Sequence, residues 1–149
     1  MRLEDYLQPE FVIGNLASES KSEVLAELVA PIKKQWPDFD AKRALQVLLD
    51  RENLGTTGIG DGVAIPHGKM ESLERIVIVV GRSLAGVSFD ALDFKPCRIF
   101  FLVLAPEHVA GLHLRILAHI SRLLSDESFR RAFLTAETDE ALRQVLAAA

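Results

Sequence analysis

Cysteine is nearly absent from this sequence, and so are the features that direct a chain to a membrane or out of the cell. Cys97 is the only cysteine among 149 residues, so no internal disulfide can form, which suits a reducing cytosol. No apolar run approaches the roughly 20 residues that a membrane-spanning helix needs. The N-terminus has no basic segment followed by an apolar one, so no signal peptide is evident. We therefore expect a cytoplasmic protein without direct membrane insertion.

Positive charge is also scarce. The 17 Lys and Arg residues are outnumbered by 21 Asp and Glu residues, the formal net charge is −4, and no dense basic block occurs. This balance argues against a nucleic-acid partner. The sequence has no Cys/His spacing typical of zinc, so we expect neither a metal nor another cofactor. With 49% hydrophobic residues and no repeat or linker, the chain is predicted to form one domain over residues 1–149.

The most distinctive segment runs from Gly55 to Lys69 and has four glycines in its first eight residues. Glycine permits positive φ and close approach of the backbone to another group. The apolar residues 63–65 predict a short buried strand, which Pro66 ends because it has no N–H for the ladder. His67 is therefore expected at a strand end on a shaped turn, where functional residues are often found.

Three interpretations of this segment compete. It can be a tight hairpin with an incidental histidine, a nucleotide-binding loop, or a loop that presents His67 as a nucleophile. The second fails because a P-loop needs Gly-Lys-Ser/Thr at the start of a helix, and the dinucleotide fingerprint lies between a strand and a helix. Here Gly58 to Gly62 leads into a strand instead. The residues of the segment do not decide between the other two.

The remaining elements predict a three-layer α/β/α domain with a small central sheet. Two continuous apolar runs, Ile76–Val80 and Ile99–Leu104, are typical of strands covered on both faces, and Gly81 is expected to end the first. A further strand is expected at 11–13, and a helix begins with the capping box at Ser20, is kinked or ended early by Pro31, and stops before Pro37. A second helix is capped by Asp38 or Asp40 and runs to Asp50 or Arg51, and its inward residues are Ala41, Leu45, Leu48 and Leu49. Three more helices are expected: one from Leu112, a short one that runs through Leu134, and one from Thr138.

Several charged or titratable residues have two possible roles. Arg51 is either a solvated charge at a helix C-terminus or part of the glycine-rich site beside it. His113 lies inside the apolar arc of its helix, and it is either a core histidine or a residue lining a site at the sheet end. Asp90 and Asp93 can be read as paired acid/base carboxylates, but turn aspartates commonly bond local backbone. His108 and His119 are expected at the surface.

The segment Gly55–Lys69, with Arg51-Glu52 upstream, resembles the active-site segment of enzyme IIA of the bacterial phosphoenolpyruvate-dependent phosphotransferase system, of the fructose/mannitol/nitrogen-regulatory type. The resemblance continues through residues 87–93, 100–106 and 113–115, and so covers nearly the whole chain. The Pro-His-Gly-Lys ending is most similar to the nitrogen-regulatory subgroup. The implied fold is a small mixed sheet between helical layers.

This resemblance implies that His67 is phosphorylated through Nε2, with Arg51 and His113 in supporting roles. Backbone amides of the loop would contribute to phosphoryl binding, since successive amides in turns form anion-binding concavities; the loop residues are Gly55, Thr56, Thr57, Gly58, Gly60 and Gly68. The implied donor is HPr, a small phosphocarrier protein itself phosphorylated on histidine, or its nitrogen-branch counterpart. Apolar residues near His67 are candidate contacts with that donor: Ile59, Ile65 and Met70. Asp61 is a departure that adds negative charge near the site.

Two roles within the family stay open. The chain can be a regulatory phosphocarrier that controls target proteins, or a fructose/mannitol-type subunit that passes the phosphoryl group to a separate sugar permease. Outside the family, the leading alternative is a module that binds an anion or a small ligand without covalent chemistry. A metal site on His67 and His113 would lack an obvious third ligand.

Overall fold

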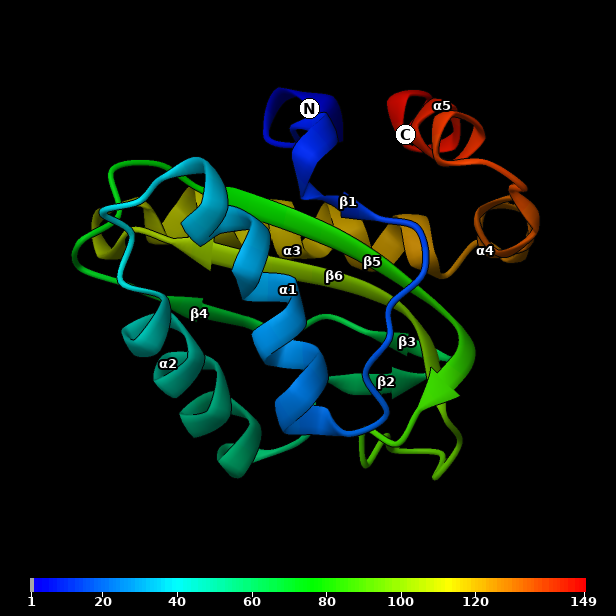
Figure 1. Cartoon of the computed structure of the whole chain (residues 1–149), viewed down its shortest axis with the longest axis horizontal. Helices are drawn as coiled ribbons and strands as arrows, with labels where there is room; N and C mark the ends of the chain where they lie inside the picture. The colour runs from blue at the N-terminus through cyan, green and yellow to red at the C-terminus, as the bar shows by residue number, and fades with distance from the viewer. Residues whose placement is uncertain (1) are drawn as a thin grey trace.

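The computed structural model describes residues 2–149 and places one mixed β-sheet between helices, as predicted (Figure 1). Two long helices, α1 (Lys21–Gln35) and α2 (Ala41–Leu54), cover one face, and α3 (Ala110–Leu124) covers the other. Alternate residues of the central strands enter different cores. Val79 and Phe100 pack with α1, whereas Val80 and Phe101 pack with α3. Both faces are buried, which explains why these strands are continuously apolar.

The sheet has the order β1-β5-β6-β3-β2, and β4 also pairs with β6. Its strands are β1 (Val12–Ile13), β2 (Gly58–Gly60), β3 (Val63–Ala64), β4 (His67–Lys69), β5 (Val77–Val87) and β6 (Cys97–Ala105). β5 and β6 are antiparallel, whereas β3 and β4 both run parallel to β6. Because β3 and β4 pair with successive parts of β6, they form one interrupted strand. The interruption is the segment that precedes His67.

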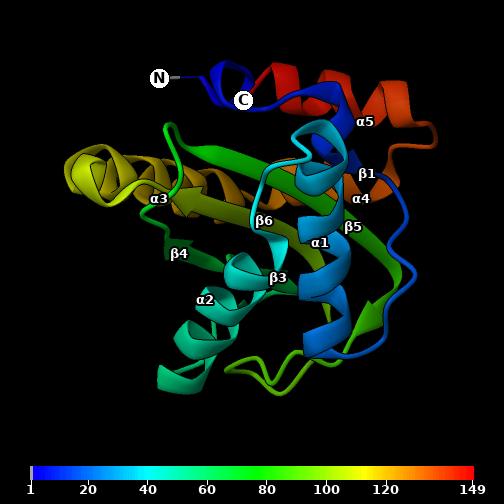
Figure 2. The ribbon, with the colours of Figure 1, turned by 60° about the vertical axis from the view of Figure 1, so that its left-hand side comes forward.

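The helices begin where the capping residues predict. Ser20, Asp40 and Thr138 each accept a hydrogen bond from the backbone N–H three residues later. The last two helices, α4 (Glu127–Thr135) and α5 (Asp139–Ala147), lie toward the β1 edge of the sheet. The N-terminal segment, with 3₁₀ turns at Leu3–Asp5 and Pro9–Phe11, lies beside α5 (Figure 2). A third 3₁₀ turn, Glu107–Val109, leads into α3. Of the described helices, none is both long enough and apolar enough to cross a membrane.

Two predicted boundaries were wrong, and a third was correct in part. α1 stops at Gln35, before Pro37 as predicted, but of the two alternatives for Pro31 an early end is wrong, because burial of residues such as Ile32 outweighs the loss of one backbone hydrogen bond. β5 continues through Gly81. A Cβ there would lie 2.8 Å from Leu28 Cδ2, so this glycine gives room for α1 to pack on the sheet and does not end the strand. α2 extends to Leu54, three residues beyond Arg51.

The prediction for the inward face of α2 was correct but incomplete. Leu48 is buried, and Ala41, Leu45 and Leu49 are partly buried against the same core, but the buried residues Ala44 and Glu52 were not predicted. Gly68 permits this packing, because a Cβ on it would lie 2.5 Å from Val47 Cγ1 of α2. The helix thus approaches β4 closely enough for its last turn to reach the start of that strand.

Candidate functional site

His67 is the first residue of β4 and is held in one orientation by a backbone contact. Its Nδ1 lies 2.8 Å from the carbonyl oxygen of Ile65. A carbonyl can only accept a hydrogen bond, so Nδ1 carries the proton and donates it. In the neutral ring, Nε2 then keeps its lone pair and is the nucleophilic atom. The prediction of a strand end is refined here, because His67 begins a second strand segment.

The pKa of His67 lies below its ordinary value. Burial is the largest cause because it disfavours the charged ring, and the hydrogen bond to Ile65 opposes it by stabilising the imidazolium. The charge of Arg51 lowers the pKa further, while that of Glu52 raises it. The ring is therefore neutral at neutral pH, which is the form that can attack a phosphoryl group.

His113 stands in the first turn of α3 and faces His67. The ring centroids are 6.0 Å apart with planes at 75°, and His113 is only 4% exposed. Its Nε2 is buried and finds no hydrogen-bond partner in residues 2–149. Burial, followed by the charges of His67 and Lys69, lowers the pKa of His113. An unsatisfied buried nitrogen is costly, and its position beside His67 suits a ligand that would supply the missing contact.

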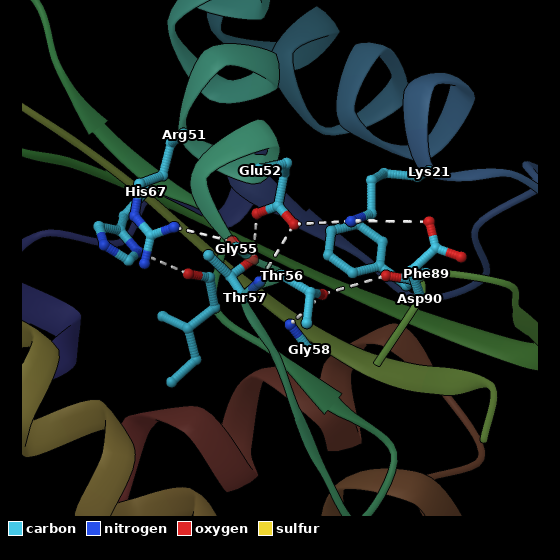
Figure 3. A network of polar contacts seen from close by, with 11 residues as sticks. Lys21, Arg51, Glu52, Gly55, Thr56, Thr57, Gly58, His67, Phe89 and Asp90 are labelled. Atoms are coloured by element: carbon cyan, nitrogen blue, oxygen red, sulfur yellow. Dashed lines mark hydrogen bonds and ion pairs between the residues drawn. The ribbon is translucent and has the colours of Figure 1, made fainter. Parts of the chain in front are cut away.

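Arg51 reaches the same place from the last turn of α2. Its Nη1 donates to the carbonyl oxygen of Gly55 at 2.8 Å, and its guanidinium lies beside His67 (Figure 3). The structure thus brings together the three predicted residues Arg51, His67 and His113 from α2, β4 and α3. Because one guanidinium has five N–H donors, the contact with Gly55 leaves others for a second acceptor.

The glycine-rich loop is internally bonded. The amide of Gly55 donates to the carbonyl of Glu52, that of Thr57 to the Glu52 carboxylate, and that of Gly58 to Thr56 Oγ1. Gly60 adopts a φ of +106°, which glycine permits. These amides support the loop's own shape, so in this conformation they are not free to bind an anion. Phosphoryl binding by the loop stays a prediction.

Glu52 belongs to the motif quoted above, but the sequence reasoning gave it no role of its own. Its side chain is 2% exposed, and its carboxylate accepts hydrogen bonds from Lys21 Nζ at 3.0 Å and from the amide and hydroxyl of Thr57. Lys21 also lies over the Phe89 ring, 4.7 Å from its centroid. The spacing Ala44, Leu48, Glu52 is the signal that reveals it, because it places Glu52 on the buried face of α2.

Other side chains have local roles. Asp93 accepts hydrogen bonds from the amides of Asp61 and Lys95, as expected of a turn aspartate, and Asp90 is largely exposed. The surface prediction holds for His108, but His119 is partly buried and its Nε2 is buried.

Two of the three candidate donor contacts were wrong. Ile65 and Met70 are 6% and 2% exposed because they pack into the core, so only Ile59 is available. Over residues 2–149, no cluster of three His, Cys, Asp or Glu side chains is arranged to hold a metal.

Comparison with known proteins decides the family. Residues 5–149 match the family described as phosphoenolpyruvate-dependent sugar phosphotransferase system, EIIA 2. The chain belongs to this enzyme IIA family. Members of the family are phosphotransferases, and the relatives of this enzyme IIA carry both nitrogen-regulatory and fructose-specific names.

Two relatives illustrate the range. A nitrogen regulatory protein of Bradyrhizobium diazoefficiens is 37% identical over 147 residues, which cover 99% of this chain and 95% of that protein. The fructose-specific EIIABC component of Bacillus subtilis is 33% identical over 98% of this chain, but the match covers only 23% of that longer protein.

Solved structures agree with the fold. The nitrogen regulatory protein IIA-Ntr from Neisseria meningitidis superposes with a TM-score of 0.89 at 29% identity, covering 97% of this chain and 98% of the other. The mannitol IIA of Escherichia coli has a TM-score of 0.78 at 22% identity, over 95% of this chain and 99% of the other, and supports the fold alone.

Proposed function

We propose that this enzyme IIA is a phosphocarrier that accepts a phosphoryl group on Nε2 of His67 from a histidine-phosphorylated, HPr-like carrier protein. The observation that carries the proposal is the contact of Nδ1 with the Ile65 carbonyl, which leaves Nε2 as the free nucleophile. Arg51 and His113 lie beside that ring.

The transfer balances as a displacement between two imidazole rings. The lone pair of His67 Nε2 attacks phosphorus as the donor's P–N bond breaks, and the donor ring leaves with that electron pair. Positive charge develops on the His67 ring, and the Ile65 carbonyl stabilises it through the proton on Nδ1. Arg51 supplies forked donors to the phosphoryl oxygens, because transfer depends mainly on positioning and charge stabilisation. His113 can donate from Nε2 once a phosphoryl oxygen provides an acceptor.

The donor must bring its ring close to His67, so the surrounding surface should carry exposed apolar residues. Leu54 and Leu114 are 85% and 67% exposed, and they lie in the same helical turns as Arg51 and His113. They replace the buried Ile65 and Met70 as candidate contacts.

We further propose a regulatory, nitrogen-branch role in which the phosphorylation state controls binding to target proteins. Full-length similarity to nitrogen regulatory proteins supports it. The alternative is delivery of the phosphoryl group to a sugar permease, which the fructose-specific relatives support. Transfer of labelled phosphate to a permease subunit and on to a sugar would favour this second role.

The covalent step is tested by intact-mass measurement after incubation with the phosphorylated carrier. The wild type should gain one acid-labile phosphoryl mass, His67→Ala should gain none, and the exposed control His108→Ala should behave as wild type. If the wild-type mass stays unchanged while the protein binds a phosphate anion reversibly, the protein would be a non-covalent binding module instead. Phosphorylation of His67→Ala would assign the site elsewhere.

A further inference from the structure

A series of hydrogen bonds runs from the first turn of α1 to the imidazole of His67, and most of it is drawn in Figure 3. Lys21 Nζ donates to Glu52 Oε1 at 3.0 Å, and the amide of Thr57 donates to the same oxygen at 3.1 Å. The carbonyl of Thr57 accepts from the amide of Ile65 at 3.0 Å. The carbonyl of Ile65 then accepts from His67 Nδ1 at 2.8 Å.

We propose that Glu52, secured by Lys21, is the positioning residue for the nucleophile. It fixes Thr57, and through Thr57 it fixes the Ile65 carbonyl that holds the proton on Nδ1 of His67. This inference rests on the proposed function, in which Nε2 attacks phosphorus. Glu52 is not assigned contact with the phosphoryl group, because its carboxylate is buried and is bonded to Lys21 and Thr57.

The tautomer of His67 needs such support. An unconstrained neutral histidine favours the proton on Nε2, which would block the nucleophilic atom. The observed contact with Ile65 selects the opposite tautomer, and it does so only while that carbonyl is aimed at the ring. The rate of phosphoryl acceptance therefore depends on how firmly Ile65 is held.

The sheet alone holds Ile65 only loosely. β3 ends at Ala64 and β4 begins at His67, so Ile65 lies in the interruption between the two paired segments. Its amide bonds to Thr57 and not to β6. On its other side, the carbonyl of Pro66 accepts from the amide of Val103 at 2.9 Å. Thr57 therefore provides the second fixed point for the Ile65 peptide.

Glu52 is well suited to fix Thr57. A buried carboxylate is costly unless it is paired and fully hydrogen-bonded, and this one has Lys21 together with both donors of Thr57. Hydrogen bonds to an ionised acceptor are about twice as strong as neutral ones. Moving Thr57 would break two of them inside a buried site, so the loop is restricted to one arrangement.

The decisive variant is the double substitution Lys21→Met with Glu52→Leu. Replacing a buried ion pair by apolar residues of similar volume is often neutral or stabilising, so the fold should survive while both acceptors for Thr57 are lost. Nitrogen NMR of the imidazole reports the tautomer in the unphosphorylated protein. Wild type should show only protonated Nδ1, and the double variant should show a substantial population with the proton on Nε2.

Transfer kinetics provide the second readout. At saturating phosphorylated carrier, the double variant should accept the phosphoryl group at least about tenfold more slowly, a change of about 1.4 kcal/mol in activation free energy. The carrier concentration for half-saturation should not change, because Lys21 and Glu52 are mostly buried. Glu52→Gln should retain most of the wild-type tautomer, since its amide oxygen can accept from the Thr57 amide and its NH₂ can donate to the hydroxyl.

Glu27 offers a matched control. Its carboxylate also accepts from two backbone amides and a hydroxyl, those of Ala17 and Ser18, but these precede α1, and in the described part of the chain no hydrogen bond links them to His67. Glu27→Ala should lower stability without changing the tautomer or the rate. Wild-type tautomer and rate in the double variant would reduce Glu52 to a stabilising residue and overturn the proposal. Because the tautomer is read without phosphate, failure of the phosphocarrier function would be seen separately, as a wild type that accepts no phosphoryl group.

Discussion

The imidazole rings of His67 and His113 meet edge to face, with their centroids 6.0 Å apart. Burial lowers the pKa of both, and the charge of a protonated His67 would further disfavour protonation of His113. Both rings are therefore neutral at neutral pH, one as nucleophile and the other with an unpartnered Nε2. In the proposed transfer, His67 supplies the nitrogen that attacks phosphorus, and His113 supplies a hydrogen-bond donor to the phosphoryl oxygens.

Removing the His113 ring should slow transfer of the phosphoryl group to His67. In His113→Ala the phosphoryl oxygens lose one donor, so we expect slower transfer, by about tenfold if one hydrogen bond worth about 1.4 kcal/mol is lost. His113→Gln, which keeps an N–H donor, should recover part of the rate. Rapid-quench measurements with phosphorylated carrier would test this. Equal rates in wild type and His113→Ala would restrict His113 to packing.

Arg51 should contribute more to the rate of phosphoryl transfer than His113 does. Charge-assisted hydrogen bonds contribute about 1.5–3 kcal/mol each, so Arg51→Ala should slow transfer by at least about tenfold. Arg51→Lys should restore only part of the rate, because lysine lacks the planar fork. Arg43→Ala, at the exposed start of the same helix, is the control. Wild-type single-turnover rates in both Arg51 variants would remove this residue from the site.

The lowered pKa of His67 sets the pH dependence of phosphoryl acceptance. Only the neutral ring attacks, so the single-turnover rate should stay constant as pH falls past the ordinary histidine value of about 6.5 and decline only at lower pH. Arg51→Ala removes a charge that lowers the pKa, so its decline should begin at higher pH. A wild-type rate that is already half-maximal above pH 6.5 would contradict the lowered pKa.

The lowered pKa values of His67 and His113 also predict how the free energy of unfolding changes with pH. The folded pKa of His67 and of His113 lies below the unfolded value, so the unfolded chain binds more protons in the window between them. The free energy of unfolding should therefore fall as pH drops below about 6.5, and it should be fully retained above that value. Urea unfolding on both sides of this window, in wild type and in His113→Gln, would test the sign. His113→Gln should lose less of its free energy of unfolding over this pH range than the wild type does.

The strongest sequence signals predicted the layers of the fold correctly. Capping residues such as Ser20 and the apolar runs around Val79 and Phe101 depend on local chemistry and burial, so the helices and the central strands were predicted from the sequence. β4 was missed because His67-Gly68-Lys69 has no apolar pattern, and it is a strand only through pairing with β6. Gly81 was misread for a related reason. Its role depends on Leu28 of α1, a contact far away in sequence.

The candidate site was only partly predictable. The proximity of His67, Arg51 and His113 at one sheet end was expected, but the contact of the His67 ring with the Ile65 carbonyl and the bond between Thr57 and the Glu52 carboxylate were not. Neither contact leaves a motif of its own.

Phe94 has an unfavourable backbone conformation, and its apolar side chain is exposed to solvent. It has a φ of +60° and its side chain is 95% exposed. The left-handed region costs a non-glycine residue about 1–2 kcal/mol, and asparagine tolerates it better than phenylalanine. Phe94→Asn should therefore raise the free energy of unfolding by about 0.5–1 kcal/mol, as measured by denaturant titration. Phe94→Ala, which keeps the strain, should raise it less. A less stable Phe94→Asn would mean that the ring makes contacts that offset the strain.

The effect of phosphorylation on partner binding follows from how the site is already bonded. A phosphoryl group on His67 would add roughly two negative charges to a chain whose formal net charge is −4. The amides of Gly55, Thr57 and Gly58 already have internal acceptors, so the loop has little reason to rearrange around the new group. A partner that covers the exposed Leu54 would have to desolvate the added charge or pair it with an arginine.

We therefore expect phosphorylation to switch partner binding by charge and desolvation at the interface, with little backbone movement. Amide spectra of the free and phosphorylated forms should superimpose outside Arg51, residues 55–69 and the region of His113. His67→Glu should imitate the phosphorylated form only in part, because one carboxylate carries less charge than a phosphoryl group. Leu54→Asp should weaken the same partner without any phosphate, since it places a charge at the rim of the site while leaving the core unchanged. Widespread shifts in α5 and in α1 beyond its first turn would indicate a conformational switch instead, because screening by solvent limits how far the added charge acts.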